Sequence, residues 1–271
     1  MSYVSKTLIT TEPEPAANDK RLSICLRADG FSFSTTTGDG MLLTFGEAEG
    51  GHARVMTAAI ADIKAFFAEV GIRPLGYKSM ELIVVSNHST WVPDELYSSA
   101  ANRQYLRLVG GDATSVMASP CPSLASTAVY SANDQLAMAF KVALPGLLVM
   151  NQHVKFVQLA PRSANHPVLL TYWREGRVDV AAFSAGRYLY GNTLSFDSRD
   201  EARFRIVEAM KTFNLDGPST ELLMCGDVDR ELFAQLRPYF PTTTLYTGNA
   251  TRFSNPAFKG LHTYRHALIL M

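Results

Sequence analysis

Few residues in this chain have the types and spacing that chemistry requires, and two histidines are the first to consider. His262 and His266 stand four residues apart in "HTYRH", a spacing that would place both imidazoles on one face of a helix, as in many zinc sites. No third ligand and no catalytic glutamate stands nearby. The apolar tail after them favours a strand, in which the two residues would lie ~13 Å apart. The sequence therefore favours two ordinary histidines over a zinc site.

A second group of polar residues follows an apolar run. His88 comes after "IVVSN" and has Ser86, Ser89 and Asp94 near it in sequence. Sites in open α/β sheets form at the carboxyl ends of strands, so His88 is either a general base or, as the sequence favours, a loop histidine beside a helix start. Cys121 lies between two prolines with no base beside it in sequence. The chain has no P-loop, GxGxxG, GxSxG or HExxH motif.

The composition is that of a globular protein with a sizeable core. Of 271 residues, 47% are hydrophobic and 18% are charged, and 25 basic residues balance 25 acidic ones. A neutral chain has no general attraction to nucleic acid, so we expect none to be bound. The N-terminus lacks an apolar signal region, and the longest apolar stretch, "VALPGLLVM", is too short to span a bilayer. Three separated cysteines without CxxC spacing indicate a reducing compartment, so we predict a soluble cytoplasmic protein.

The elements that must position any site form two similar halves, and the first half opens with a β-meander. Apolar residues alternate on both sides of Asp29-Gly30, the strongest short-range hairpin signal, and the turn at 38–40 leads into a third strand. Beyond it we expect a helix over 55–70 that ends at a capping Gly71. Further predictions are a strand over 80–86, a helix that starts at Pro93, a loop over 110–126, a strand over 126–131, a helix over 132–143, a strand over 146–152 and a short helix over 154–160.

The second half repeats this order. It predicts strands over 168–174, 177–183 and 188–196, a helix capped by Asp197 or Ser198, a strand over 220–226, a helix over 227–240 capped by Asp227 and a strand over 242–247. Each half therefore follows the order β-β-β-α-β-α-β, with at least one more strand and helix in the first, which implies mixed sheets covered by helices. Tyr188 and Tyr190 are predicted to share one face, where they either pack against a helix, the favoured interpretation, or form a partner-binding surface.

This duplicated order resembles that of the actin-like ATPase superfamily, which includes actin, sugar kinases, Hsp70-type chaperones and bacterial pilus and secretion scaffold proteins. "RLSICLRADGFSFS" and "STWVPDELY" also resemble a family of uncharacterised Bacteroidetes proteins of unknown function assigned to that fold. The resemblance covers the chain from about Leu22 to its end and implies an α/β fold of two ribonuclease H-like halves. We predict a flexible arm over 1–20, a first half over 21–165 and a second half over 166–271.

The resemblance also implies where a nucleotide would bind. In active members ATP lies in the cleft between the halves. Each first hairpin carries an Asp-x-Gly turn, whose N–H groups face phosphate and whose aspartate holds Mg²⁺, and a later glycine pair approaches the adenosine. The matching positions of this chain are Ala28-Asp29-Gly30, Arg174-Glu175-Gly176 and, with a single glycine, Gly226-Asp227.

All three motifs therefore depart from the pattern. Asp29 is displaced by one residue, which in a strand sends a side chain to the other face. Asp29 and Glu175 are either metal ligands or, as the sequence favours, simple turn residues. Arg174 stands where the family has its acid; it could grip phosphate, although a surface hairpin arginine is the favoured interpretation.

These departures predict a catalytically inactive pseudo-ATPase that acts as a protein-interaction or scaffold module with an unidentified protein partner. The alternative is an active Mg²⁺-dependent ATPase or phosphotransferase. We assign no catalytic residue, no metal ligand and no cofactor, with ATP and Mg²⁺ kept as the open possibility. The candidate cleft residues are Asp29, Gly30, Glu175, Gly176, Gly226 and Asp227. A nucleic-acid role would need a basic stripe, for which Arg203 and Arg205 are too few.

Overall fold

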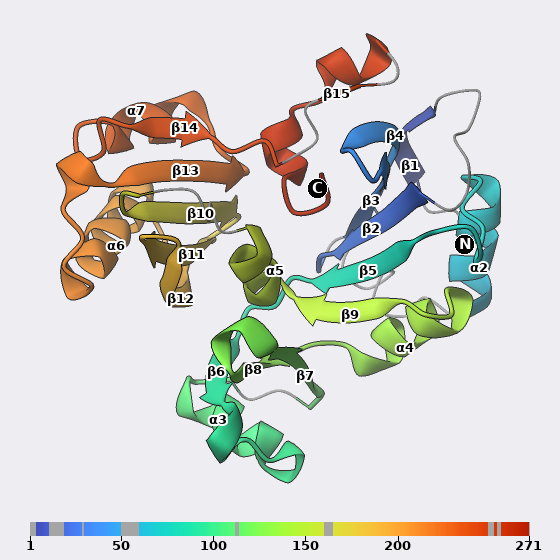
Figure 1. Cartoon of the computed structure of the whole chain (residues 1–271), viewed down its shortest axis with the longest axis horizontal. Helices are drawn as coiled ribbons and strands as arrows, with labels where there is room; N and C mark the ends of the chain where they lie inside the picture. Colours follow the sequence, from blue (N-terminus) through green and yellow to red (C-terminus); the bar gives the residue numbers. More distant parts are fainter. Residues whose placement is uncertain are drawn as a thin grey trace. The chain divides into compact units, whose positions relative to one another are not determined.

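The computed structural model describes residues 4–10, 19–28, 30–49, 60–111, 114–159, 165–248, 252–253 and 256–270 (Figure 1). The chain divides into two compact units, one of residues 1–152 with 249–261 and 268–271, the other of residues 153–248 with 262–267. Each unit is built on its own mixed sheet. No helix in the described ranges is long and apolar enough to cross a membrane. The predicted boundaries after residues 20 and 165 stay predictions.

The large sheet of the first unit contains the predicted meander and two parallel strands. Its strands are β1 (Val4–Thr10), β2 (Lys20–Leu26), β3 (Gly30–Thr37), β4 (Met41–Glu49), β5 (Ser79–Val84), β9 (Leu148–Asn151) and β15 (Arg252–Phe253). The order across the sheet is β1-β4-β3-β2-β5-β9, and β15 also pairs with β4. β2, β3 and β4 pair antiparallel, whereas β5 is parallel to β2 and β9 is parallel to β5.

Two helices build the core of this unit against the sheet. α2 (Ile60–Glu69) and α4 (Asp134–Ala143) supply apolar residues to one cluster with β2, β3 and β5. Phe31 lies edge-on to Phe66 of α2 and Phe140 of α4, at centroid distances of 5.0 and 5.5 Å, a geometry that aromatic pairs prefer. α2 ends as predicted, since Gly71 has a φ of +78°, which glycine adopts without steric cost.

A smaller sheet is inserted between β5 and β9. It has the order β6-β8-β7, with β6 (Ser89–Pro93), β7 (Val116–Cys121) and β8 (Ser126–Ser131) all antiparallel. α3 (Asn102–Leu108) packs on this sheet. Short 3₁₀ turns, η2 (Asp94–Leu96), η3 (Ser99–Ala101) and η4 (Pro122–Leu124), connect its elements.

The second unit repeats the topology of the first. Its sheet has the order β12-β11-β10-β13-β14, and its elements are β10 (Val168–Arg174), β11 (Arg177–Ser184), β12 (Arg187–Ser195), α6 (Arg199–Thr212), β13 (Glu221–Gly226), α7 (Arg230–Leu236) and β14 (Thr243–Leu245). In both sheets the strands of the predicted unit therefore lie in the order 3-2-1-4-5, with the first three antiparallel and the last two parallel to the first. The duplicated α/β fold predicted from the sequence is confirmed.

The two faces of the second sheet are covered by different helices. α6 and α7 pack on one face, where Ile206 and Leu236 join a core with Val180. α5 (Gln152–Leu159) packs on the other face, where the ring centroid of Phe156 lies 6.4 Å from that of Tyr172.

The ends of the chain differ in how well they were predicted. Residues 4–10, expected to lie in a flexible arm, form β1 and pair with β4; the β-branched Val4, Thr7, Ile9 and Thr10 favour a strand, a signal hidden by the Glu and Pro residues that follow. At the C-terminus, residues 267–270 are buried, and the Ser34 hydroxyl donates to the Ile269 carbonyl oxygen at 2.5 Å. These last residues follow two further 3₁₀ segments, η6 (Pro256–Gly260) and η7 (Thr263–His266).

Two predictions within the inserted sheet were wrong. Pro93 is the last residue of β6 and precedes only a short 3₁₀ turn, η2, with Asp94 and Glu95 in it, and the α-helix begins nine residues after Pro93, at Asn102. The predicted loop over 110–126 contains β7, and its Pro120 is tolerated because β7 is an edge strand of the small sheet. Residues 55–59 of the first predicted helix lie outside the described residues.

The shared face predicted for Tyr188 and Tyr190 was also wrong. The β11–β12 register shifts between Ala182, which faces Tyr190, and Phe183, which faces Tyr188, so Leu189 is an extra residue. This bulge breaks the alternation of side chains. Tyr190 stacks on Phe213 at 4.3 Å, beside the α6 core, whereas Tyr188 contacts Phe183.

Candidate functional site

The turn between β10 and β11 is the second of the two turns singled out in the sequence. Arg174 pairs with Arg177, so Glu175 and Gly176 alone make the turn. Gly176 has a φ of +63° and accepts a hydrogen bond at 3.0 Å from the Phe196 N–H. Glu175 is exposed. Gly176 is required for the backbone conformation of the turn, and the Glu175 carboxylate faces solvent.

The Gly226-Asp227 pair lies at the same end of the sheet, because β13 runs parallel to β10 and places Gly226 opposite Trp173. Gly226 has a φ of +84°, and a Cβ there would lie 2.3 Å from the Trp173 carbonyl oxygen. That oxygen accepts a hydrogen bond from the Asp227 N–H at 2.9 Å. The glycine therefore serves the close approach of two backbones.

Asp227 was predicted to cap α7, and this prediction was wrong. The cap is Asp229, whose carboxylate accepts the Leu232 N–H at 2.7 Å. Asp227 precedes it by two residues and is exposed. The structure thus brings four candidate residues, Glu175, Gly176, Gly226 and Asp227, to one end of β10 and β13. Their binding of a nucleotide stays a prediction.

In the first unit, the matching turn lies between β2 and β3. Asp29 lies outside the described residues. Gly30 is buried at the start of β3, and its carbonyl oxygen accepts the Arg27 N–H at 2.8 Å. The Arg27 guanidinium pairs with the Glu47 carboxylate of β4 at 3.0 Å. The positive charge of Arg27 beside this turn is therefore neutralised by a residue of the same sheet.

An ion pair beside the second turn is the most distinctive charged arrangement of this unit. Arg174 contacts Asp179 of β11 with two nitrogens, Nε to Oδ2 at 3.0 Å and Nη2 to Oδ1 at 2.9 Å. Asp179 is fully buried, and the Arg174 side chain is 14% exposed. Bidentate pairs of this kind hold both groups in a fixed geometry. Arg174 is therefore neither the surface arginine favoured by the sequence nor an arginine free to grip phosphate.

A hydroxyl and an imidazole extend this pair into a buried network. The Thr193 hydroxyl of β12 donates to Asp179 Oδ1 at 2.6 Å. His153 Nε2 of α5 lies 3.2 Å from the Thr193 oxygen and 3.8 Å from Asp179 Oδ1. Burial lowers the pKa of His153, and the Asp179 charge opposes that shift only in part. The network joins three strands, β10, β11 and β12, to the helix α5 that covers them.

Two further groups lie beside this network. Cys225 is fully buried and its thiol donates to the Thr171 carbonyl oxygen at 3.2 Å. Burial, followed by the Asp179 charge, raises the pKa of the Cys225 thiol, which removes it as a nucleophile near neutral pH. Burial also raises the pKa of Tyr246 to about 12. These groups can hold the strands together, and they are not activated for catalysis.

The polar group expected at His88 is a structural cluster. The Ser86 hydroxyl donates to the His88 carbonyl oxygen at 2.8 Å and lies 2.9 Å from the Ser131 hydroxyl. The Gln152 amide exchanges hydrogen bonds with the backbone of Ser86, at 3.0 Å to its N–H and 2.9 Å to its carbonyl. His88 thus enters the cluster through its backbone, which agrees with the loop interpretation.

The histidine pair and Cys121 are the remaining candidates from the sequence. His266 lies in η7 and His262 directly before it, a 3₁₀ turn instead of the expected strand. No group of three or more metal-ligating side chains occurs within the residues that the structure describes. Cys121, like Cys25 and Cys225, is buried and forms no disulfide.

Comparison with known proteins places the chain in a family and a fold. The family of proteins of unknown function DUF3822 matches residues 11–243. A solved protein of Bacteroides thetaiotaomicron, with an actin-like ATPase fold and unknown function, is 17% identical with a TM-score of 0.69, over 94% of this chain and 97% of that one. The likeness confirms the predicted actin-like fold. No curated protein matches the chain.

Two further solved structures share the fold at lower identity. One belongs to the PilM–PilN type IV pilus biogenesis complex, with 12% identity, a TM-score of 0.56, and coverage of 94% of this chain and 97% of that one. The other is the ethanolamine utilization protein EutJ of Carboxydothermus hydrogenoformans, with 10% identity, a TM-score of 0.53, and coverage of 97% and 93%. At these identities the likeness is one of fold alone.

Proposed function

This chain belongs to DUF3822, a family of proteins of unknown function, and from its residues we propose that it is a catalytically inactive relative of the actin-like ATPases that acts as a protein-interaction or scaffold module. The proposal has two parts, the loss of nucleotide chemistry and the gain of a binding role. Each part rests on a different region and has its own test.

The Arg174–Asp179 pair carries the first part. A Mg²⁺ ion bound with phosphate needs carboxylate or water oxygens that are free to coordinate it. At the second turn the acid is replaced by Arg174, a permanent cation. Asp179 is the one buried carboxylate among the described residues, and Arg174 neutralises it. The remaining acids of this strand end, Glu175 and Asp227, are exposed. The arginine at the position of the family's acid, together with the neutralised Asp179, supports the loss of Mg²⁺–nucleotide chemistry at this turn.

A thermal-shift titration with ATP and ADP tests this part. A ligand that binds the folded state with a Kd of ~10 µM would add about 2.7 kcal/mol of stability at 1 mM. We expect the melting temperature in 1 mM nucleotide to be the same with Mg²⁺ as with EDTA. A Mg²⁺-dependent rise would contradict the proposal and would favour the active ATPase or phosphotransferase.

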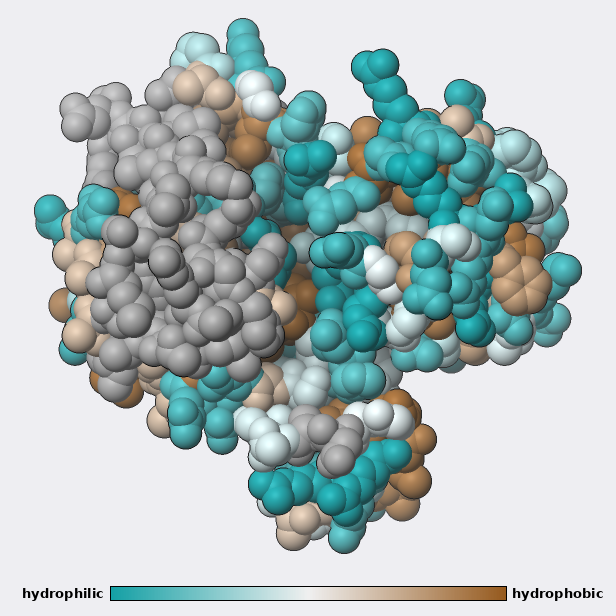
Figure 2. Space-filling model, turned by 180° about the vertical axis from the view of Figure 1, so that it is seen from behind, coloured by the Kyte–Doolittle hydropathy of each residue, from teal (hydrophilic) through white to brown (hydrophobic). Residues whose placement is uncertain are grey.

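The second part is supported by an apolar surface on the inserted subdomain. Leu96 of η2 is 69% exposed and Leu108 of α3 is 84% exposed. Tyr105, one turn before Leu108 in α3, donates its hydroxyl to the Leu96 carbonyl oxygen at 2.5 Å, and its ring stacks on that of Tyr97. Hydrophobic residues gather along one side of the lobe formed by α3 and the small sheet (Figure 2). Exposed leucines next to ordered tyrosines are typical of protein-binding surfaces.

The PilM–PilN structure gives weaker support to the proposed binding role, because it shows a protein of this fold in a complex with another protein. The cytoplasmic location predicted from the cysteines is part of the proposal, and the three buried cysteines, which form no disulfide, agree with a reducing compartment.

The binding role is tested with the double variant Leu96→Ser/Leu108→Ser. Wild type and variant carry an affinity tag and are each expressed in, and purified from, the organism that makes this protein. We expect wild type to retain one partner in a fixed ratio and the variant to lose it at an unchanged melting temperature. Leu75→Ser is the matched control, since Leu75 is also 84% exposed but lies outside this surface. Equal retention by all three chains would contradict the assignment of this surface.

A further inference from the structure

The apolar surface of the inserted subdomain carries opposite charges at its two ends. At one end Glu95 directly precedes Leu96 in η2. At the other end Arg107 directly precedes Leu108 in the last turn of α3. All four side chains are exposed. Each of the two exposed leucines therefore has a charged neighbour in the chain, acidic for Leu96 and basic for Leu108.

Neither of these two charges is engaged within the part of the chain that the structure describes. No ion pair and no side-chain hydrogen bond there involves Glu95 or Arg107. The nearest charged neighbours do have contacts. The Asp94 carboxylate accepts a hydrogen bond from the Thr127 hydroxyl at 3.0 Å, and the Arg103 guanidinium donates to a backbone carbonyl oxygen at 3.0 Å. The acid and the base beside the two leucines are thus left for a partner.

A tyrosine fastens the two ends of the surface to each other. Tyr105 lies one turn before Leu108 in α3. Its hydroxyl donates to the Leu96 carbonyl oxygen at 2.5 Å and accepts the Ser98 N–H at 3.1 Å. Its ring stacks on that of Tyr97, with 6.4 Å between the centroids. Because the η2 end is held against α3 in this way, the surface loses little conformational entropy when a partner binds both ends.

A surface with these two ends is complementary to itself. In an interface with twofold symmetry the same patch serves both copies, and residue i of one copy meets residue j of the other. When the basic end of one copy meets the acidic end of the second, Leu108 packs on the second copy's Leu96 and Arg107 pairs with the second copy's Glu95. The symmetry forms each contact twice and brings no like charges together. A partner of one charge sign would match one end and be repelled by the other.

We propose, on the basis of the binding role proposed above, that this surface joins two copies of the chain in a symmetric dimer. The contacts are two Glu95–Arg107 ion pairs and two Leu96–Leu108 contacts, each between the copies. The partner that a tagged chain retains is then an untagged copy of the same chain. An interface of this kind is small and therefore weak, so the dimer should dissociate on dilution.

Sedimentation velocity of the purified full chain over ~1–300 µM, the range suited to a weak interface, measures this association. We expect the mass to rise from one chain toward two with concentration. Glu95→Arg places an arginine opposite Arg107 at both contacts, and Arg107→Glu places two acids opposite each other. Each variant alone should associate on the order of a hundredfold more weakly than wild type. An equal mixture of the two should associate as tightly as wild type, because a mixed dimer contains both ion pairs.

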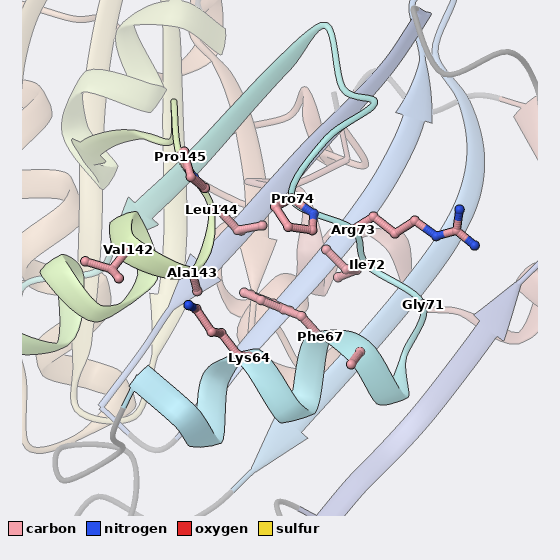
Figure 3. Close-up of a pocket in the computed structure, with 11 residues that line it drawn as sticks. Lys64, Phe67, Gly71, Ile72, Arg73, Pro74, Val142, Ala143, Leu144 and Pro145 are labelled. Carbon is pink, nitrogen blue, oxygen red and sulfur yellow. The ribbon is translucent and has the colours of Figure 1, made fainter.

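Further variants separate this pairing from general effects of charge. Glu95→Arg/Arg107→Glu in one chain restores both pairs with reversed sign and should dimerise like wild type. Glu69→Arg and Lys141→Glu are matched reversals at exposed positions of α2 and α4, helices whose ends border a hollow outside the inserted subdomain (Figure 3). They should leave association unchanged. All of these variants change exposed side chains, so their melting temperatures should stay close to that of wild type.

A wild-type chain that stays monomeric at the highest concentration would overturn the proposed dimer. A mixture of Glu95→Arg and Arg107→Glu that associates no more tightly than its components would overturn it as well. The proposed binding role would survive either result if Leu96→Ser/Leu108→Ser still lost a different protein in the purification from cells, so failure of the dimer and failure of the binding role are distinguishable.

Discussion

Removal of Arg174 should destabilise the second unit strongly, because it leaves a charge buried without its counter-ion. In Arg174→Met the hydrocarbon stem is largely kept, but Asp179, which is fully buried, loses both guanidinium contacts. Loss of one partner of a buried pair costs about 3–5 kcal/mol. The Thr193 hydroxyl still donates to Asp179, so we expect the low end, about 3 kcal/mol of unfolding free energy.

Urea unfolding followed by Trp173 fluorescence measures this cost. Trp173 is buried next to Arg174, and Trp91 is the only other tryptophan, so a Trp91→Phe background reports on the second unit alone. Arg174→Met with Asp179→Leu should recover most of the loss, since an apolar replacement of the whole pair is often neutral. Arg205→Met, which breaks an exposed pair with Glu201, should cost about 0.5 kcal/mol. An Arg174→Met cost no larger than that of Arg205→Met would refute the account of the pair.

Other predictions concern the same unit and its turns. Gly226→Ala should lower the unfolding free energy by well over ~2 kcal/mol in thermal unfolding, because its Cβ would lie 2.3 Å from the Trp173 carbonyl oxygen. Gly71→Ala, at a residue with positive φ but open space around it, should cost about 1 kcal/mol. Equal costs for the two variants would argue against the close approach of Gly226 to the Trp173 backbone. Asp229→Ala should lower the unfolding free energy by about 1 kcal/mol because α7 loses its N-cap, whereas Asp227→Ala should lower it by less than ~0.5 kcal/mol. A larger loss for Asp227→Ala than for Asp229→Ala would identify Asp227 as the cap. Because burial lowers the pKa of His153, the unfolded chain takes up a proton below about pH 6.5 that the folded chain does not, so stability should fall toward acid by up to ~1.4 kcal/mol per pH unit. His153→Gln should remove that slope in urea unfolding at pH 5 and 7, and an unchanged slope would contradict it.

The fold was predictable where local signals agreed with the global topology. Alternation around Asp-Gly and Glu-Gly turns, glycine after α2 and the capping candidates Asp197 and Ser198 before α6 all predicted the observed elements, with Ser198 as the observed cap, and the repeated order predicted the duplication. Errors arose where the decisive contact is distant in sequence. Pro120 is compatible with β7 only because that strand lies at a sheet edge, and the Leu189 bulge that separates Tyr188 from Tyr190 is set by pairing with β11.

The candidate site was predictable only in part. A two-residue turn at Glu175-Gly176 fixes the register that places Asp179 opposite Tyr172 and diagonal to Arg174, so an acid in the apolar run "RVDVAAF" was a usable signal for the ion pair. No comparable signal links the distant His153 to Asp179, because their proximity depends on how α5 packs on the sheet.

ATP turnover by the purified full chain tests the central claim most directly. The account predicts that phosphate release in Mg²⁺ equals that in EDTA, since Arg174 neutralises the buried acid beside the second turn. Saturable, Mg²⁺-dependent release that Glu175→Gln or Asp227→Asn abolishes would contradict it and identify the chain as an active enzyme.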